Sequence, residues 1–110
     1  MFVYHKNCLK KDIGTGIRFQ NLGKARQMNV WHWNMEDGSV VSMHTHTSEQ
    51  FGYVISGGFE MVIGDERGVL QAGDAYFIPS NIPHEFKARG ETEAIDVFSP
   101  VRPDKDIPGQ

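Results

Sequence analysis

The stretch from Gly38 to Gly57, GSVVSMHTHTSEQFGYVISG, decides how this chain is interpreted. Its two histidines, His44 and His46, lie two positions apart in a segment that has no helical periodicity. In an extended strand, residues i and i+2 point to the same face. Both imidazoles are therefore expected to face one point, as the first two ligands of a metal ion do.

The composition of the chain is that of one folded domain. Its 110 residues, 39% of them hydrophobic, suffice for a single modest core, so we expect one domain over residues 1–110. Twelve glycines and five prolines indicate many turns and short strands rather than long helices.

Charge and cysteine usage exclude several classes of partner. The formal net charge is −3 and no run of Lys or Arg stands out, so nucleic acid and anionic membranes are poor candidates. No apolar run approaches membrane-spanning length, and the N-terminus has no signal-peptide pattern. Cys8 is the single cysteine, which rules out an internal disulfide. These features favour a soluble, cytoplasmic protein.

From residue 30 onward, short extended segments alternate with turn residues. The predicted strands are 30–35, 40–46, 50–56, 59–63, 69–71, 75–78, 84–88 and 94–98. Glycines at 14, 16 and 23 break the preceding part into short pieces, and the proline-rich segment 99–110 is expected to wrap over the surface. This pattern predicts a closed or sandwiched antiparallel all-β domain.

Strand parity extends the candidate site to a second strand. If His44 points inward, residues 40, 42 and 46 are expected inward and residues 41, 43 and 45 outward. On the next strand, Gln50 can offer its amide oxygen as a third ligand, and Gly52 then leaves room beside it. Glu49 competes, because a carboxylate is generally the better ligand, but it falls in the turn.

His84 is the candidate fourth ligand. Pro79 and Pro83 form a stiff bend that delivers this histidine to the start of a new strand. A hairpin return could place it opposite the first two histidines.

The spacing of these residues resembles the two motifs of the cupin superfamily. The first runs from Gly38 through the two histidines and Gln50 to Gly57, with Gln where Glu is usual. The second runs from Gly73 through Pro79 and Asn81 to His84, with Asn where Gly is usual. The resemblance implies a double-stranded β-helix, the jelly-roll cupin barrel, and the register set by Gly57 supports Gln50 over Glu49.

The resemblance also implies a metal centre with the ligands His44, His46, Gln50 and His84. Three imidazoles and an amide accept one divalent transition metal, which could be Zn, Ni, Mn, Fe or Co. Four neutral ligands leave the ion its full +2 charge. Such an ion favours an anionic or oxygen-rich small-molecule substrate and Lewis-acid chemistry.

The last predicted strand carries a carboxylate among apolar residues. Burying Asp96 is costly unless it is paired or used. It could act as a general acid or base, with Phe98 as an apolar wall and Arg102 holding a substrate carboxylate. Alternatively, Asp96 and Arg102 form a structural ion pair at the barrel rim. The pattern alone leaves both interpretations open.

The segment DVFSP followed closely by Arg resembles the cupins of pectin and alginate breakdown. Those proteins convert 4,5-unsaturated monouronates into linear ketonised sugars. The resemblance implies the metal ligands given above and Asp96, Phe98 and Arg102 as catalytic residues. Two alternatives are a metal-dependent dioxygenase and a non-enzymatic cupin that binds metal or sugar.

Phe51, Tyr53 and Ile55 face outward if Gln50 faces inward. Three large apolar side chains on an outer face need cover, and a second subunit can provide it. We therefore expect a homodimer. The alternative is cover by the N-terminal segment.

Overall fold

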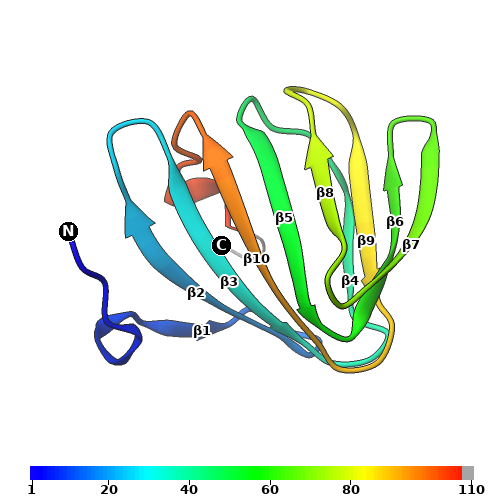
Figure 1. The fold of residues 1–110 in the computed structure, drawn as a ribbon, viewed down its shortest axis with the longest axis horizontal. Helices are drawn as coiled ribbons and strands as arrows, with labels where there is room; N and C mark the ends of the chain where they lie inside the picture. The colour runs from blue at the N-terminus through cyan, green and yellow to red at the C-terminus, as the bar shows by residue number, and fades with distance from the viewer. Residues whose placement is uncertain (108–110) are drawn as a thin grey trace.

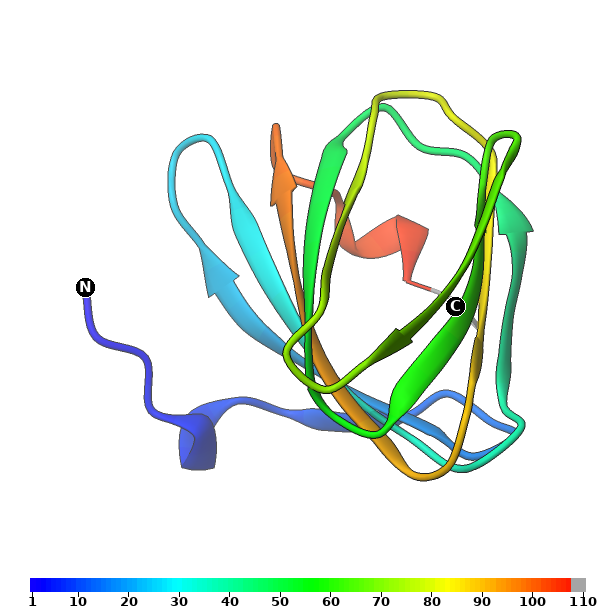
Figure 2. The ribbon, with the colours of Figure 1, turned by 45° about the vertical axis from the view of Figure 1, so that its right-hand side comes forward.

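Ten strands form two antiparallel sheets that face each other, in a computed structural model that describes residues 1–107 (Figures 1 and 2). The elements in chain order are η1 (His5–Asn7), β1 (Lys10–Asp12), β2 (Ile17–Lys24), β3 (Asn29–Met35), β4 (Val40–His44), β5 (Glu49–Ser56), β6 (Gly58–Ile63), β7 (Glu66–Gln71), β8 (Ala75–Ile78), β9 (His84–Ala88), β10 (Thr92–Ser99) and η2 (Asp104–Asp106).

The strand order makes this pair of sheets a jelly roll. One sheet has the order β1-β2-β3-β10-β5-β8 and the other β4-β9-β6-β7. Chain neighbours such as β4 and β5 lie in different sheets, so the connections close the barrel, as the sequence predicted. Figure 2 shows β10 and β5 on one side and β4 and β9 on the other. No helix within residues 1–107 has the length and apolar character needed to span a membrane.

Two strands lie in the N-terminal part, where the sequence predicted only short pieces. β2 pairs with β3, and β1 adds to β2 at the edge of the sheet. Gly23 does not end β2, because it lies at a register shift after Asn21 with a φ of +115° and so forms an irregularity within the strand. Gly68 likewise lies inside β7, which begins at Glu66 instead of the predicted Val69.

A bulge in β4 reverses the predicted parity of Val40 and Val41, which lie before it. Val41 pairs with Phe86 and His44 pairs with His84, so three positions on β4 match two on β9. As a result, Val41 lies in the core with 6% exposure, whereas Val40 is 46% exposed. The prediction for residues 40 and 41 was therefore wrong, and β4 ends at His44, two residues before its predicted end.

An aromatic cluster occupies the core beneath the end of the barrel that carries the histidines. The rings of Trp31 and Phe98 are 4.7 Å apart, and Phe19 lies 5.6 Å from Trp31 and 5.5 Å from Trp33. The two pairs that include Trp31 pack edge to face, which stabilises the arrangement beyond the area it buries. The ring of His46 lies 5.7 Å from Phe98, so the cluster supports the candidate site directly.

The segment after β10 is fixed to the barrel rather than lying loosely over it. Asn29 accepts a hydrogen bond from the backbone N–H of Arg102 at 2.8 Å and donates to its carbonyl at 3.1 Å. The side chains of Arg102 and Ile107 are both buried. The expected surface course of segment 99–110 thus fails for these two residues, and residues 108–110 lie outside the described part of the chain.

Candidate metal centre

Three histidines converge at one end of the barrel. His44 is the last residue of β4 and His84 the first of β9; the two are paired in register, which brings their ring centroids to 4.2 Å. His46, in the loop after β4, has its ring 4.8 Å from that of His84. One candidate ligand nitrogen from each residue lies within 4.8 Å of the others. The predicted convergence of the histidines is therefore present in the structure.

The hydrogen bonds of these imidazoles fix their tautomers. Each ring approaches, with Nδ1, a backbone carbonyl two residues away, at 2.7 Å for His44 and 2.8 Å for the other two. The three carbonyls are those of Ser42, Ser48 and Ile82. Because a carbonyl can only accept, Nδ1 carries the proton and Nε2 keeps a free lone pair. This is the form in which histidine binds a metal, with its second nitrogen held by a backbone oxygen.

Gln50 completes a donor set that suits a cation. Its side chain is buried on β5, and its Oε1 lies 3.0 Å from Nε2 of His46. Both of these atoms are acceptors, so neither satisfies the other without a cation between them. Nε2 of His84 is buried and has no partner. Glu49, the competing candidate, is exposed. Three neutral imidazoles and an amide fit a divalent transition metal.

Burial keeps the three imidazoles neutral. It lowers the pKa of His84 to about 4, although the hydrogen bond to the carbonyl of Ile82 acts to raise it. The positive charge of Arg102 lowers this pKa further. Burial also lowers the pKa of His44 and of His46. At neutral pH the nitrogens are therefore free of the protons that would compete with a metal.

Asp96 lies inside the barrel in the middle of β10, with 1% exposure. Tyr76 donates a hydrogen bond to its Oδ1 at 2.7 Å, whereas its Oδ2 is buried and has no partner. Burial raises the pKa of Asp96, and the hydrogen bond from Tyr76, the neighbouring side chains of Gln50 and Trp33 and the charge of Arg102 oppose this rise. A buried carboxyl with one free oxygen can exchange a proton with a ligand beside it.

Arg102 is buried beside the site but does not pair with Asp96. Its guanidinium stacks on Trp31 and Phe98, 4.8 and 5.1 Å from the ring centroids. Its ion-pair partner is Asp106, with 3.8 Å between Nε and the nearer carboxylate oxygen. The structural Asp96–Arg102 ion pair that the sequence left open is therefore absent from residues 1–107. Phe98 is fully buried, with its ring next to those of Trp31 and His46, and its role as an apolar wall of the site stays a prediction.

The buried polar side-chain atoms without partners gather around this site. Within the described residues they are Nε1 of Trp31 and of Trp33, Nε2 of His84, Oδ2 of Asp96 and Nε of Arg102. Native proteins leave few buried polar groups unpaired, so such a group of atoms marks a place where a ligand can supply the missing partners. The two indoles could not be singled out from the sequence, because tryptophan on an alternating strand is ordinarily a core residue.

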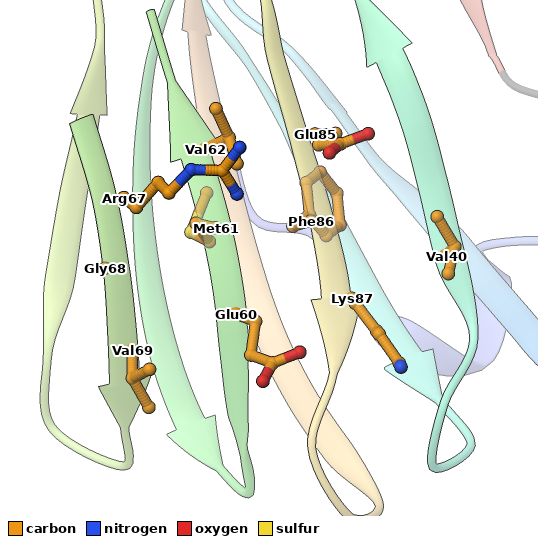
Figure 3. A pocket seen from close by; sticks show the side chains of 10 residues that line it. All are labelled: Val40, Glu60, Met61, Val62, Arg67, Gly68, Val69, Glu85, Phe86 and Lys87. Carbon is orange, nitrogen blue, oxygen red and sulfur yellow. The ribbon is translucent and has the colours of Figure 1, made fainter. Parts of the chain in front are cut away.

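A cleft of about 420 Å³ borders the centre, and its lining includes His44 and Arg102. Its other lining residues are Ile13, Thr15, Ile17, residues 40–43, Thr45 and Asp106. A larger hollow of about 550 Å³ lies over the four-stranded sheet (Figure 3). Its charged side chains are Glu60, Arg67, Glu85 and Lys87, and its lining includes no histidine. Of these two hollows, the smaller one is therefore the one that reaches a proposed metal ligand.

Comparison with known proteins agrees with this geometry. Residues 31–98 match the family model described as the cupin domain. The chain belongs to the cupin superfamily. This cupin is 31% identical over 96 residues to the pectin degradation protein KdgF of Dickeya dadantii, covering 86% of this chain and 87% of that protein.

Two solved structures share the fold over nearly their whole length. An RmlC-like cupin from Shewanella frigidimarina has a TM-score of 0.88 and 30% identity, with 94% of each chain covered. The structure of KdgF from a Halomonas species has a TM-score of 0.86 and 28% identity, with 96% of each chain covered. This cupin is therefore similar in sequence and in structure to proteins of the KdgF type.

Proposed function

We propose that this cupin is a metal-dependent enzyme that converts 4,5-unsaturated monouronates into linear ketonised sugars. The observation that carries the proposal is the convergence of three imidazole nitrogens at one end of the barrel, next to Gln50, which also neighbours the buried carboxyl of Asp96, with the buried guanidinium of Arg102 acting on both. Similarity to KdgF proteins, one of which is named for pectin degradation, supports the substrate class.

In this proposal each part of the site has one role. His44, His46, Gln50 and His84 would hold a divalent ion, which supplies Lewis acidity toward substrate oxygens and keeps its +2 charge among neutral ligands. Arg102 lines the cleft and binds the carboxylate of the sugar.

Asp96 moves the proton. In an unsaturated uronate, the double bond joins C4 to C5 and the ring oxygen is attached to C5. When the ring opens, the anomeric hydroxyl loses a proton and the bond from C1 to the ring oxygen breaks. The resulting enol becomes a ketone when C4 gains a proton, so the reaction is an isomerisation without any co-reactant. The free Oδ2 of Asp96 is suited to accept the first proton and return one to C4.

The direct test follows the double bond. The protein loaded with a divalent metal should accelerate the loss of the 4,5-double-bond absorbance of unsaturated galacturonate or mannuronate. Asp96→Asn should abolish this activity while the metal content stays unchanged. A wild-type protein that accelerates no unsaturated monouronate contradicts the proposal. Oxygen uptake in the same preparation would favour a dioxygenase, and sugar binding without turnover would favour a binding protein.

We also propose that the protein forms a homodimer through the outer face of the six-stranded sheet. Tyr53, Ile55 and Phe77 on this face are 40%, 42% and 73% exposed, and Phe77 stacks 5.1 Å from Phe51. The outer face of the four-stranded sheet carries mixed charges instead (Figure 3). The N-terminal turn is bound to Gln20 on β2 and leaves the apolar side chains of β5 exposed. An apolar face of this kind suits a second copy of the chain.

A further inference from the structure

The hydrogen bond between Tyr76 and Asp96 joins two strands that are not neighbours. Tyr76 is on β8 and Asp96 on β10, and β5 runs between them. Two steps between adjacent strands span about 9.6 Å. The tyrosine ring must therefore lie flat across the inner surface of β5 for its hydroxyl to reach the carboxylate.

Gly52 is the residue of β5 over which the ring passes. It pairs with Asp96 on one side and with Tyr76 on the other, so the three residues form one row across the sheet. A Cβ added at Gly52 would lie 1.9 Å from Cζ of the ring and 2.4 Å from its hydroxyl oxygen. The backbone itself does not require glycine here, because Gly52 is not among the residues with positive φ.

This contact corrects the role expected of Gly52. The space above it is filled by the ring of Tyr76, not left free beside Gln50. Tyr76 could not be singled out from the sequence, because its partnership depends on the strand order.

Because of this contact, Oδ1 of Asp96 accepts a hydrogen bond, whereas Oδ2 has no hydrogen-bond partner among the described residues. Tyr76 is buried, so its hydroxyl donates its hydrogen bond to the carboxylate and not to solvent. A carboxylate fixed at Oδ1 cannot rotate freely, and the direction of Oδ2 is then set by the row of three residues.

We infer that Tyr76 is a positioning residue that orients the Asp96 carboxylate for proton transfer. Gly52, which has no side chain, leaves room for the Tyr76 ring to cross β5 and reach this carboxylate. This inference rests on the proposed function of Asp96. Positioning errors of about 1 Å can cost on the order of 100-fold in rate.

The first experiment separates turnover from binding. Tyr76→Phe removes the hydroxyl and keeps the ring, so kcat should fall about 10- to 100-fold while KM and metal content stay within about twofold. Gly52→Ala keeps both polar groups but displaces the ring, and it should lower kcat in the same way. Tyr4→Phe, at an exposed tyrosine before η1, is the matched control and should leave kcat unchanged. Wild-type kcat in Tyr76→Phe would overturn the inference.

The second experiment does not depend on activity. In metal-free protein with Asp96 intact, Tyr76→Phe should lower the folding equilibrium constant about tenfold, since it removes a buried hydrogen bond to a carboxylate. In an Asp96→Ala background the hydroxyl has lost its acceptor, and the same change should be neutral or stabilising. Equal effects in the two backgrounds would show that the pair is not coupled. If wild-type protein converts no unsaturated uronate, the proposed function fails. The comparison of the two backgrounds, a double-mutant cycle, still decides whether the Tyr76 hydroxyl interacts with Asp96.

Discussion

His84 gives the metal-free protein a stability that depends on pH, and its size follows from the structure. The imidazole is fully buried and its folded-state pKa is about 4, against an ordinary value of 6.5. Between these values the unfolded chain binds more protons than the folded protein, so lowering the pH favours unfolding. The stabilisation is complete above pH 6.5 and is lost as the pH falls toward 4.

The magnitude can be worked out from this difference in pKa. Each unit corresponds to about 1.4 kcal/mol, so at pH 5 the free energy of unfolding should be lower by about 2 kcal/mol than at pH 7. Below pH 4 the loss should reach about 3 kcal/mol. In a domain of about 100 residues, 2 kcal/mol lowers Tm by on the order of 8 °C.

The assay compares wild-type protein with His84→Asn in excess chelator. Asparagine can still donate to the carbonyl of Ile82 but does not titrate. Urea unfolding at pH 7, 6 and 5 should show the wild type losing about 2 kcal/mol more than the variant over this range. Other groups that titrate contribute to both proteins and largely cancel. Parallel losses in the two proteins would refute the reasoning about His84.

The remaining predictions concern the ligands and the apolar face. His84→Ala should abolish stoichiometric metal binding, measured by elemental analysis. His32→Ala removes a histidine that pairs with Glu93 outside the site, and this variant should still bind metal. An unchanged metal content in His84→Ala would remove that residue from the ligand set. Gln50→Glu should bind metal at least as tightly but raise KM for an anionic uronate several-fold, because the added charge weakens the attraction to the substrate; an unchanged or lower KM in steady-state kinetics would contradict this. Tyr53→Glu should shift the protein to monomer in gel filtration, and an unchanged elution volume would place the dimer contact elsewhere.

The parts of this protein that the sequence predicted are those fixed by local spacing. His44 and His46 face one centre because they are two positions apart, and Gln50 follows at a distance set by one short turn. The sequence pattern left open whether Asp96 lies inside the barrel or forms an ion pair at its rim, and the structure places it inside with 1% exposure.

The parts that the sequence did not predict depend on how strands pair. The bulge before His44 inserts one residue that no local signal announces, and it exchanges the environments of Val40 and Val41. The contact from Tyr76 requires the order β10-β5-β8, which joins segments far apart in the chain. β2 was missed because Gly23 resembled a strand break, although the register shift accommodates it within the strand.

In the proposed site, the attachment of Arg102 to Asn29 would separate substrate selection from chemistry. The proposed ligands and Asp96 come from the barrel strands and the loop that joins β4 to β5, whereas Arg102 belongs to a segment beyond the last strand, tied down by two hydrogen bonds to one asparagine. That segment can change its length or its charged residue without altering any strand register. In the proposed site, exchanging the segment around Arg102 could therefore change the charge or size of the accepted sugar while the proposed metal ligands stay the same.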